Sequence, residues 1–263
     1  MTNPIGHPEK SLILEDNIMR PRFRCLTIAF SISFLGMTVQ TQAEERPRLK
    51  KLKPPSVTLL GHPLIFRDEF NNGKADHWEP TDPTAWRVIR QGRNYVYNQF
   101  KKRSKYKPPV RSPYNRSLVK GIHVGSFVLD VHVQSTHKDY GHRDLCLFFG
   151  YQDNAHLYYV HLGKKTDDHA NQIFIVNGKP RTKISTKTTP GTNWDDEWHH
   201  VRIVRDVNSG KIEVYFDDMS NPVMKANDKT FTWGRVGVGS FDDTGNFDRV
   251  LLYGEKVSVA KKK

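Results

Sequence analysis

The chain has 263 residues, with 41 lysines and arginines against 28 aspartates and glutamates and a formal net charge of +13. Its 37% hydrophobic and 11% aromatic residues are enough for a packed core, which excludes an intrinsically disordered chain. The two cysteines, Cys25 and Cys146, exclude a disulfide-stapled scaffold, and the single long apolar stretch excludes a multi-spanning membrane protein.

The first predicted element is an export signal over residues 1–43. The apolar run Cys25–Val39 follows a basic stretch at 19–24, and the small residues Thr41 and Ala43 stand three positions and one position before the expected cut. This layout is typical of a signal peptide, and the run is short for a membrane span. We therefore expect an exported mature protein without a membrane span, located in the periplasm, at the cell surface or outside the cell. Met19 is a second candidate start codon.

Basic residues flank the predicted domain and form one segment within it. Residues 44–55 are predicted to be a basic flexible leader and residues 255–263 a basic tail, which leaves 56–254 for a single domain. Within it, residues 101–120 hold eight basic side chains and no acidic one. This favours an anionic polymer as partner, and outside a cell that means a sulfated or uronate-containing polysaccharide rather than nucleic acid. A loop that serves only solubility is the alternative. The predicted contacts are Lys101, Lys102 and Arg103.

Short alternating strands separated by turn residues follow from residue 56 onward. Apolar residues occupy every second position from Phe127 to Val133, and strand-like runs follow at 157–162, 172–176 and 212–216. Asn177-Gly178 is a strong hairpin turn. No stretch with helical periodicity is longer than about two turns, so the pattern predicts an all-β, two-sheet antiparallel β-sandwich.

Several of these segments together resemble a known superfamily. Residues 198–205, 212–217, 234–239 and 247–250, with the opening segment 65–70, are similar to strands of concanavalin A-like lectin/glucanase jelly rolls. The nearest in style are laminin-G-like (LamG-like) and 3-keto-disaccharide hydrolase-type domains of secreted bacterial proteins. The resemblance implies a jelly roll that engages carbohydrate. It does not select an activity, because this fold carries lectins, hydrolases, lyases and adhesion modules.

One enzymatic class of the superfamily is disfavoured. Retaining glucanases of this fold place three acids on one strand as Glu-x-Asp-x-x-Glu, so that alternate residues flank a glycosidic bond. The chain lacks this motif, and Asp195-Asp196-Glu197 are consecutive loop residues.

Histidines are concentrated between residues 132 and 169. Jelly-roll polysaccharide lyases use a neutral base, a tyrosine acid and a group that neutralises the uronate, which His, Tyr, Arg and Gln can supply. Val131, Val160 and Ile173 are expected to face the core. The opposite face of their strands then carries Asp130, His132, Tyr159, His161 and Gln172, which line a groove provided that these strands belong to the concave sheet. Scattered surface histidines without a role are the alternative. The candidate catalytic residues are His161, Tyr159 and His132. The candidate substrate-binding residues are His137, His142, Arg143, His156, His169, Gln172 and Trp194, of which Trp194 is expected to be exposed.

A possible metal site lies near the end of the domain. Asp242, Asp243 and Asp248 flank a turn and offer the oxygen ligands that Ca²⁺ prefers, and laminin-G-like domains often bind this ion. Aspartate and glycine are also common in turns for backbone reasons, so the sequence requires no cofactor. Cys146, within the apolar run 145–149, is predicted to be a small core residue.

The sequence thus predicts an exported jelly-roll protein that binds an anionic polysaccharide. Two alternatives stay open: a polysaccharide lyase or glycoside hydrolase with a His/Tyr site on the concave sheet, and a structural or adhesion module of the cell surface.

Overall fold

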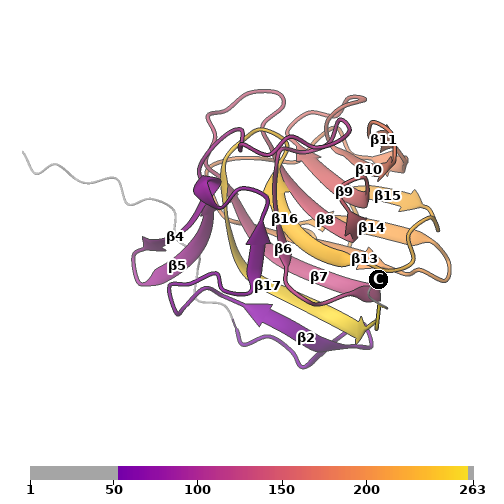
Figure 1. Cartoon of the computed structure of the whole chain (residues 1–263), viewed down its shortest axis with the longest axis horizontal. Helices are drawn as coiled ribbons and strands as arrows, with labels where there is room; N and C mark the ends of the chain where they lie inside the picture. The colour runs from indigo at the N-terminus through magenta and orange to yellow at the C-terminus, as the bar shows by residue number, and fades with distance from the viewer. Residues whose placement is uncertain (1–52, 260–263) are drawn as a thin grey trace, which may run out of the picture. The chain divides into compact units, whose positions relative to one another are not determined.

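The computed structural model describes residues 53–259, so the predicted signal peptide, most of the leader and the last four residues lie outside the described residues. The described chain is almost entirely β-structure, with one short 3-10 helix, η1 (Pro83–Ala85). Two antiparallel sheets pack face to face (Figure 1), which confirms the predicted two-sheet sandwich. Within residues 53–259 no helix has the length and apolar character that crossing a membrane requires.

The first sheet, called here the long sheet, is built around the closing strand of the chain. Strand β17 (Gly245–Lys256) pairs with β7 (Val124–Ser135) along most of its length. Its first residues also pair with β5 (Asn94–Gln99), which forms a hairpin with β4 (Trp86–Gln91). The sheet runs β1 (Thr58–Leu59), β2 (His62–Asp68), β17 (Gly245–Lys256), β7 (Val124–Ser135), β13 (His199–Arg205), β14 (Lys211–Phe216), β15 (Met224–Asn227) and β12 (Ser185–Thr188), with β5 (Asn94–Gln99) and β4 (Trp86–Gln91) attached to β17.

The second sheet, called here the short sheet, is built from the middle of the chain. It runs β11 (Thr182–Lys183), β10 (Gln172–Asn177), β9 (His156–Gly163), β8 (Asp144–Asp153), β16 (Arg235–Ser240), β6 (Asn115–Val119) and β3 (Trp78–Pro80). The hairpin from β10 to β11 includes the predicted Asn177-Gly178 turn, where Gly178 has a φ of 65°. That left-handed conformation suits glycine.

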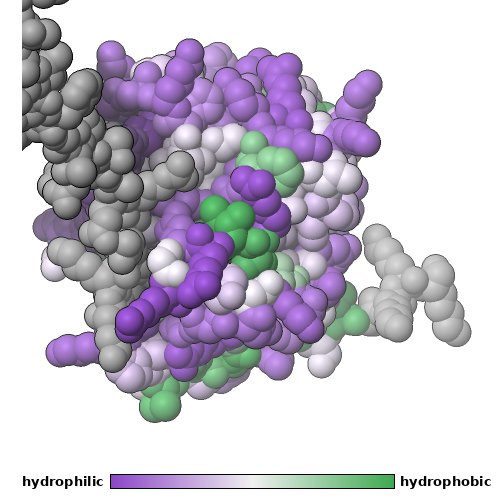
Figure 2. Space-filling view, turned by 90° about the vertical axis from the view of Figure 1, so that its left-hand side faces the viewer, coloured by the Kyte–Doolittle hydropathy of each residue, from purple (hydrophilic) through white to green (hydrophobic). Residues whose placement is uncertain are grey.

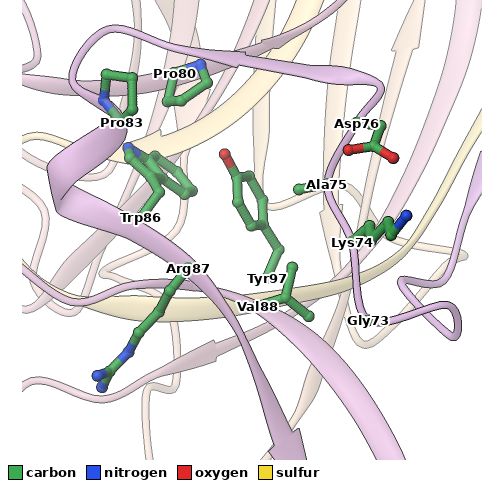
Figure 3. A pocket seen from close by; sticks show the side chains of 10 residues that line it. All are labelled: Gly73, Lys74, Ala75, Asp76, Pro80, Pro83, Trp86, Arg87, Val88 and Tyr97. Atoms are coloured by element: carbon green, nitrogen blue, oxygen red, sulfur yellow. The ribbon is translucent and has the colours of Figure 1, made fainter.

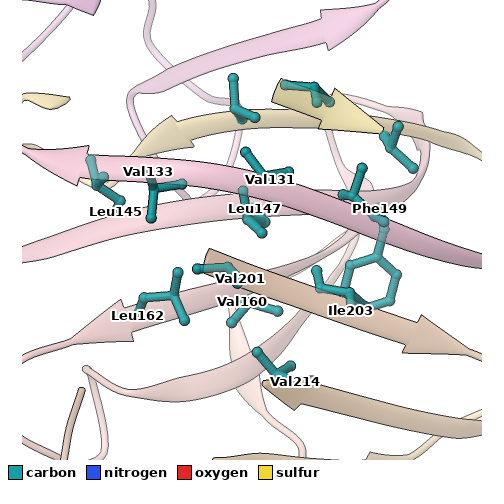
Figure 4. Packing of buried hydrophobic residues seen from close by; sticks show 14 of the residues in the cluster. Val131, Val133, Leu145, Leu147, Phe149, Val160, Leu162, Val201, Ile203 and Val214 are labelled. Carbon is teal, nitrogen blue, oxygen red and sulfur yellow. The ribbon is translucent and has the colours of Figure 1, made fainter. Parts of the chain in front are cut away.

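The main core fills the space between the two sheets. Val131 and Val133 on β7 and Val201 on β13 face Leu145 and Leu147 on β8, as Figure 4 shows. These residues occupy alternate positions of their strands, and all five are fully buried. The alternation read from the sequence over residues 127–133 therefore assigns the inner face of β7 correctly, because successive side chains of a strand point to opposite sides.

The outer face of the short sheet is also buried. Its apolar side chains form a second cluster that includes Cys146, Phe148, Tyr159 and Phe174. Residues 100–114, which connect β5 to β6 and are called here the covering segment, contribute Val110 to this cluster. The backbone N–H of Arg181 donates to the carbonyl oxygen of Arg111 and ties the segment to the chain after β10. The short sheet thus lies between two apolar layers.

Candidate functional site

Tyr159 and His161 lie together on the outer face of the short sheet, as the alternation predicted. Gln172 on β10 is in register with His161 on β9. Tyr159 is fully buried and His161 is 5% exposed. The groove expected above these residues is therefore absent from the described residues, because the second apolar layer fills it.

His132 does not belong to this group. It lies on β7, which is a strand of the long sheet, so the expectation that His132 shares a face with His161 is wrong. Its ring stacks on His200 at a centroid distance of 4.8 Å and an interplanar angle of 3°. Burial, together with the charges of His200 and Arg249, lowers the pKa of His132 to about 3. His132 is therefore a neutral imidazole at physiological pH, within a polar network on the other side of the sandwich.

Tyr159 is held by its neighbours. Its hydroxyl accepts a hydrogen bond from Arg181 Nη1 at 2.8 Å, and its ring stacks on Phe174 at 5.1 Å. Burial raises the pKa of Tyr159 well above its ordinary value. The phenol is thus neutral, and a polymer has no open path to it in this arrangement.

Three of the predicted substrate-binding histidines are paired with aspartates. His142 Nε2 lies 2.8 Å from Asp167, and Nδ1 of His156, the first residue of β9, lies 2.7 Å from Asp153 at the end of β8. His137 Nε2 lies 3.4 Å from Asp243. His169, whose ring makes no such pair among the described residues, uses its carbonyl oxygen to accept from His161 Nδ1 at 2.7 Å. His142 and His169 thus lie together beside Asp167, whose carboxylate also accepts from the backbone N–H of His169, whereas His156 lies at the other end of β9 from His161.

Arg143 and Gln172 have structural partners. The guanidinium of Arg143 is 2% exposed and donates to Ser135 Oγ and to the carboxylate of Asp196. The side-chain amide of Gln172 donates to the carbonyl oxygen of Asp167 at 2.8 Å. Both side chains link loops to the sheets.

The prediction that Trp194 is exposed is wrong. Trp194 is 2% exposed, its Nε1 donates to the carbonyl oxygen of Leu162 at 2.7 Å, and its ring packs edge-on against Phe216. The polar residues around it indicate only that the loop backbone reaches the surface. The indole itself turns inward, where a hydrogen-bonded tryptophan can fill the core.

The three predicted calcium ligands do not meet. Carboxylate oxygens of Asp242 and Asp243 lie within 4.8 Å of each other and of Asp144, whereas Asp248 is bound elsewhere, by the side-chain amide of Asn94. Burial and the nearby charge of Asp144 raise the pKa of Asp243 to about 6. Asp144 could not be found from the turn at 242–248, because it lies at the start of β8, far along the chain from that turn.

The described residues contain a pocket of about 320 Å³ beside the β4–β5 hairpin (Figure 3). The rings of Trp86 and Tyr97 stack at a centroid distance of 4.6 Å and form its aromatic wall. Trp86 Nε1 is buried without a hydrogen-bond partner among the described residues. The pocket is lined by Gly73, Lys74, Ala75, Asp76, Pro80, Pro83, Trp86, Arg87, Val88 and Tyr97. The side of the molecule where β4 and β5 lie shows an apolar patch surrounded by hydrophilic side chains (Figure 2).

The pocket adjoins the start of the covering segment. Lys101 Nζ donates to Thr84 Oγ1 in η1 at 3.1 Å, and the backbone N–H of Lys105 donates to Asp82 at 2.7 Å. The hydrogen bond from Lys105 helps to hold the pKa of Asp82 below its usual range. The helix that forms one side of the pocket therefore also anchors the basic segment.

Most cations of the covering segment are exposed, and its Val110 packs against the apolar cluster on the outer face of the short sheet. Among the described residues, Arg103 is the one with an acidic partner, Asp242 at 3.4 Å. The predicted contacts Lys102 and Arg103 are exposed, and Lys101 is half-buried. We call the exposed set the basic ridge; it consists of Lys102, Arg103, Lys105, Lys107 and Arg111.

No protein-family model and no curated protein matches this chain. Among solved structures it is similar to the carbohydrate binding module CBM66 from Bacillus subtilis, with a TM-score of 0.49 and 16% identity over 68% of this chain and 96% of that one. It is also similar to winged bean acidic lectin complexed with methyl-α-D-galactose, with a TM-score of 0.46 and 12% identity over 73% and 98% of the two chains. The Emp47p carbohydrate recognition domain gives a TM-score of 0.48 and 11% identity over 73% and 96%. These likenesses concern the fold alone.

Proposed function

We propose that this protein binds carbohydrate, and that its partner is an anionic polysaccharide outside the cell. The observation that carries the proposal is the joining of an aromatic pocket to a ridge of exposed cations, of which Arg103 alone has an ion-pair partner among the described residues. Export rests on the signal-like residues 1–43. Structural neighbours named as carbohydrate-binding modules and lectins support the coarser part of the proposal, a sugar partner.

The pocket has the composition that a sugar ring requires. Its volume lies at the lower end of the range for small-ligand sites. Trp86 and Tyr97 are 6% and 2% exposed, so a pyranose can contact only the small part of these rings that reaches the pocket, and the charged side chains of Lys74, Asp76 and Arg87 can meet hydroxyl or carboxylate groups at the rim.

The cations of the basic ridge attract an anionic polysaccharide but not a neutral one. A single exposed ion pair contributes little, with typical values below about 1 kcal/mol. A polymer that repeats a negative charge engages several cations at once, so these small contributions add along the chain. The attraction weakens as salt rises, because the screening length is only about 8 Å at physiological ionic strength.

Binding without cleavage fits these residues better than catalysis does. The candidate catalytic pair, Tyr159 and His161, is buried beneath the second apolar layer. The proposed site instead lies at the β4–β5 hairpin, where we find no pair of carboxylates among the residues that line the pocket. We therefore propose a binding module.

The test compares two variants with the same loss of charge. In the ridge variant, Lys102, Arg103, Lys105 and Lys107 are replaced by Gln. In the control, four exposed lysines outside the ridge are replaced by Gln; they are Lys179, Lys187, Lys229 and Lys256. Calorimetric titrations use heparin and polygalacturonate as anionic probes and dextran as a neutral one, over a range of salt concentrations.

We expect the ridge variant to bind the anionic probes at least about tenfold more weakly at low salt, with a flatter salt dependence, because fewer charges are neutralised on association. The control should bind as the unmodified protein does. Equal losses in both variants would reduce the effect to net charge and refute a localised site. A separate variant, Ala75→Leu, fills the pocket and should lower the affinity without changing the salt dependence.

A further inference from the structure

A second arrangement of ligand-type side chains lies on the outer face of the short sheet, and it is independent of the proposed carbohydrate site. Asp144 and Cys146 are two residues apart on β8, so they point to the same face, and Cys146 is in register with His161 on β9. One oxygen of Asp144, the Cys146 sulfur and one nitrogen of His161 all lie within 4.8 Å of one another. All three side chains are buried.

The same oxygen, Asp144 Oδ2, is the nearest neighbour of both other groups. Cys146 Sγ lies 3.5 Å from it, and His161 Nε2 lies 3.2 Å from it. Tetrahedral zinc bound by oxygen, nitrogen and sulfur at ordinary lengths places its ligand atoms about 3.3 Å apart for N and O and about 3.5 Å apart for S and O. The observed separations match those of ligands that share one zinc ion.

The hydrogen bonds of His161 leave Nε2 free to act as a ligand. Nδ1 lies 2.7 Å from the carbonyl oxygen of His169. A carbonyl oxygen can only accept, so Nδ1 carries the proton and Nε2 of the neutral ring carries a lone pair. A metal-bound histidine typically shows this arrangement, with its second nitrogen held by a carbonyl or carboxylate.

Nε2 and the carboxylate are close, but they are not hydrogen-bonded. His161 Nε2 has no hydrogen-bond partner among the described residues, although Asp144 Oδ2 is 3.2 Å away. The direction of the Nε2 lone pair therefore does not run along the line to that oxygen. Ligands of one metal show the same relation, because their lone pairs converge on the ion and not on each other.

We propose that Asp144, Cys146 and His161 bind a zinc ion. A thiolate, an imidazole and a carboxylate are the ligand types that zinc accepts, whereas calcium and magnesium prefer oxygen alone. The carboxylate and the thiolate balance the two positive charges of the ion, and binding releases the thiol proton to solvent. These three side chains leave one position of a tetrahedral zinc site to a further ligand.

The surroundings fix the ligands and close the site. The backbone N–H of Phe241 donates to Asp144 Oδ2 at 2.9 Å, and the ring of His161 stacks on that of Phe241 at 5.9 Å. The guanidinium of Arg181 lies over the Phe241 ring at 4.4 Å. The ion therefore binds as the chain folds and serves stability, since it joins β8, β9 and the loop that contains His169.

The test uses the full chain carrying Cys25→Ser, so that Cys146 is its one thiol. The protein is refolded from urea in the presence of ZnCl₂, dialysed, and its zinc content measured by mass spectrometry. Affinity is then measured by competition with a chromophoric chelator. We expect one zinc per chain in the parent, and an affinity lowered more than about 100-fold by Cys146→Ser or His161→Gln, since even loss of an outer hydrogen-bond partner costs about 10–100-fold. His77→Gln, an exposed histidine elsewhere, should keep the ion.

Less than stoichiometric zinc in the parent overturns the proposal. Equal affinity in the parent and both variants also overturns it, because the ion would then lie elsewhere. If the variants do not fold, the proposal is tested on the parent protein refolded with Co²⁺, by its absorption spectrum. A thiolate-to-cobalt charge-transfer band supports the site, and a spectrum without that band refutes it.

Discussion

Asp248 offers a direct test of how burial controls the stability of this fold. Its carboxylate is 2% exposed on β17, where Oδ2 accepts from Asn94 Nδ2 and Oδ1 accepts from the backbone N–H of Arg249. These two hydrogen bonds do not compensate for burial, which raises the pKa of Asp248 to about 7, with a further contribution from the charges of Glu69 and Asp68. The charged form is therefore penalised in the folded state.

The sign and size of the effect follow from linkage. Because the folded pKa lies above the value of about 3.9 for an unfolded chain, the unfolded state loses this proton first as pH rises. The folded protein then loses stability between about pH 4 and pH 7, and the loss is complete above the folded pKa. A shift of about three units corresponds to roughly 3–5 kcal/mol. Asp248→Asn removes the penalty, so it should stabilise the protein by that amount at pH 8.

The assay is urea unfolding of both proteins at pH 4.5 and at pH 8, followed by tryptophan fluorescence. At pH 4.5 Asp248 is protonated in the fold, so the two free energies of unfolding should nearly agree. At pH 8 the variant should be the more stable. A variant that is less stable than the parent at pH 8 would refute the reasoning and show that the charged carboxylate has partners strong enough to offset its burial.

Three further substitutions test packing and pairing by the same urea measurement. Arg202→Met removes the bidentate partner of buried Asp130 and should cost about 3 kcal/mol or more, whereas the double change with Asp130→Leu should recover most of that loss. Trp194→Phe removes the hydrogen bond to Leu162 and part of an indole from the core, and should cost about 1–3 kcal/mol; no change would mean that the indole is not buried. Gly150→Ala should cost at least about 1 kcal/mol, because φ is 54° and the new Cβ would lie 2.8 Å from the ring of Tyr158; a neutral result would show that the backbone relaxes there.

The parts of this structure that depend on local sequence were predictable. The alternation at 127–133 identifies the inner face of β7, and the turn residues around Gly210 join β13 to its antiparallel neighbour β14. The same holds for the two-sheet class, because many short strands without helices have few other ways to bury their apolar faces.

The candidate site required long-range information that the sequence pattern does not contain. Alternation predicts that His132 and His161 both point away from their core neighbours, but it does not specify which sheet each strand joins. The two histidines lie on opposite sides of the sandwich for this reason. Similarly, Asp242 and Asp243 are joined by Asp144 instead of Asp248, because strand register, and not distance along the chain, determines which carboxylates meet.

The sequence does contain a pattern that indicates burial of the outer face of the short sheet. Residues 145–149 and 157–160 are continuous apolar runs, whereas a strand with one solvent-exposed face alternates between apolar and polar residues. Such runs indicate a strand covered on both faces, so a second layer above β8 and β9 was to be expected. The pattern does not identify the covering segment, because residues 100–114 are chiefly basic and polar. Val110 of this segment packs against the outer face of the sheet, and the cations of the basic ridge are exposed to solvent. The segment that closes the sheet face to a glycan therefore also carries the charges with which we propose that the protein binds one.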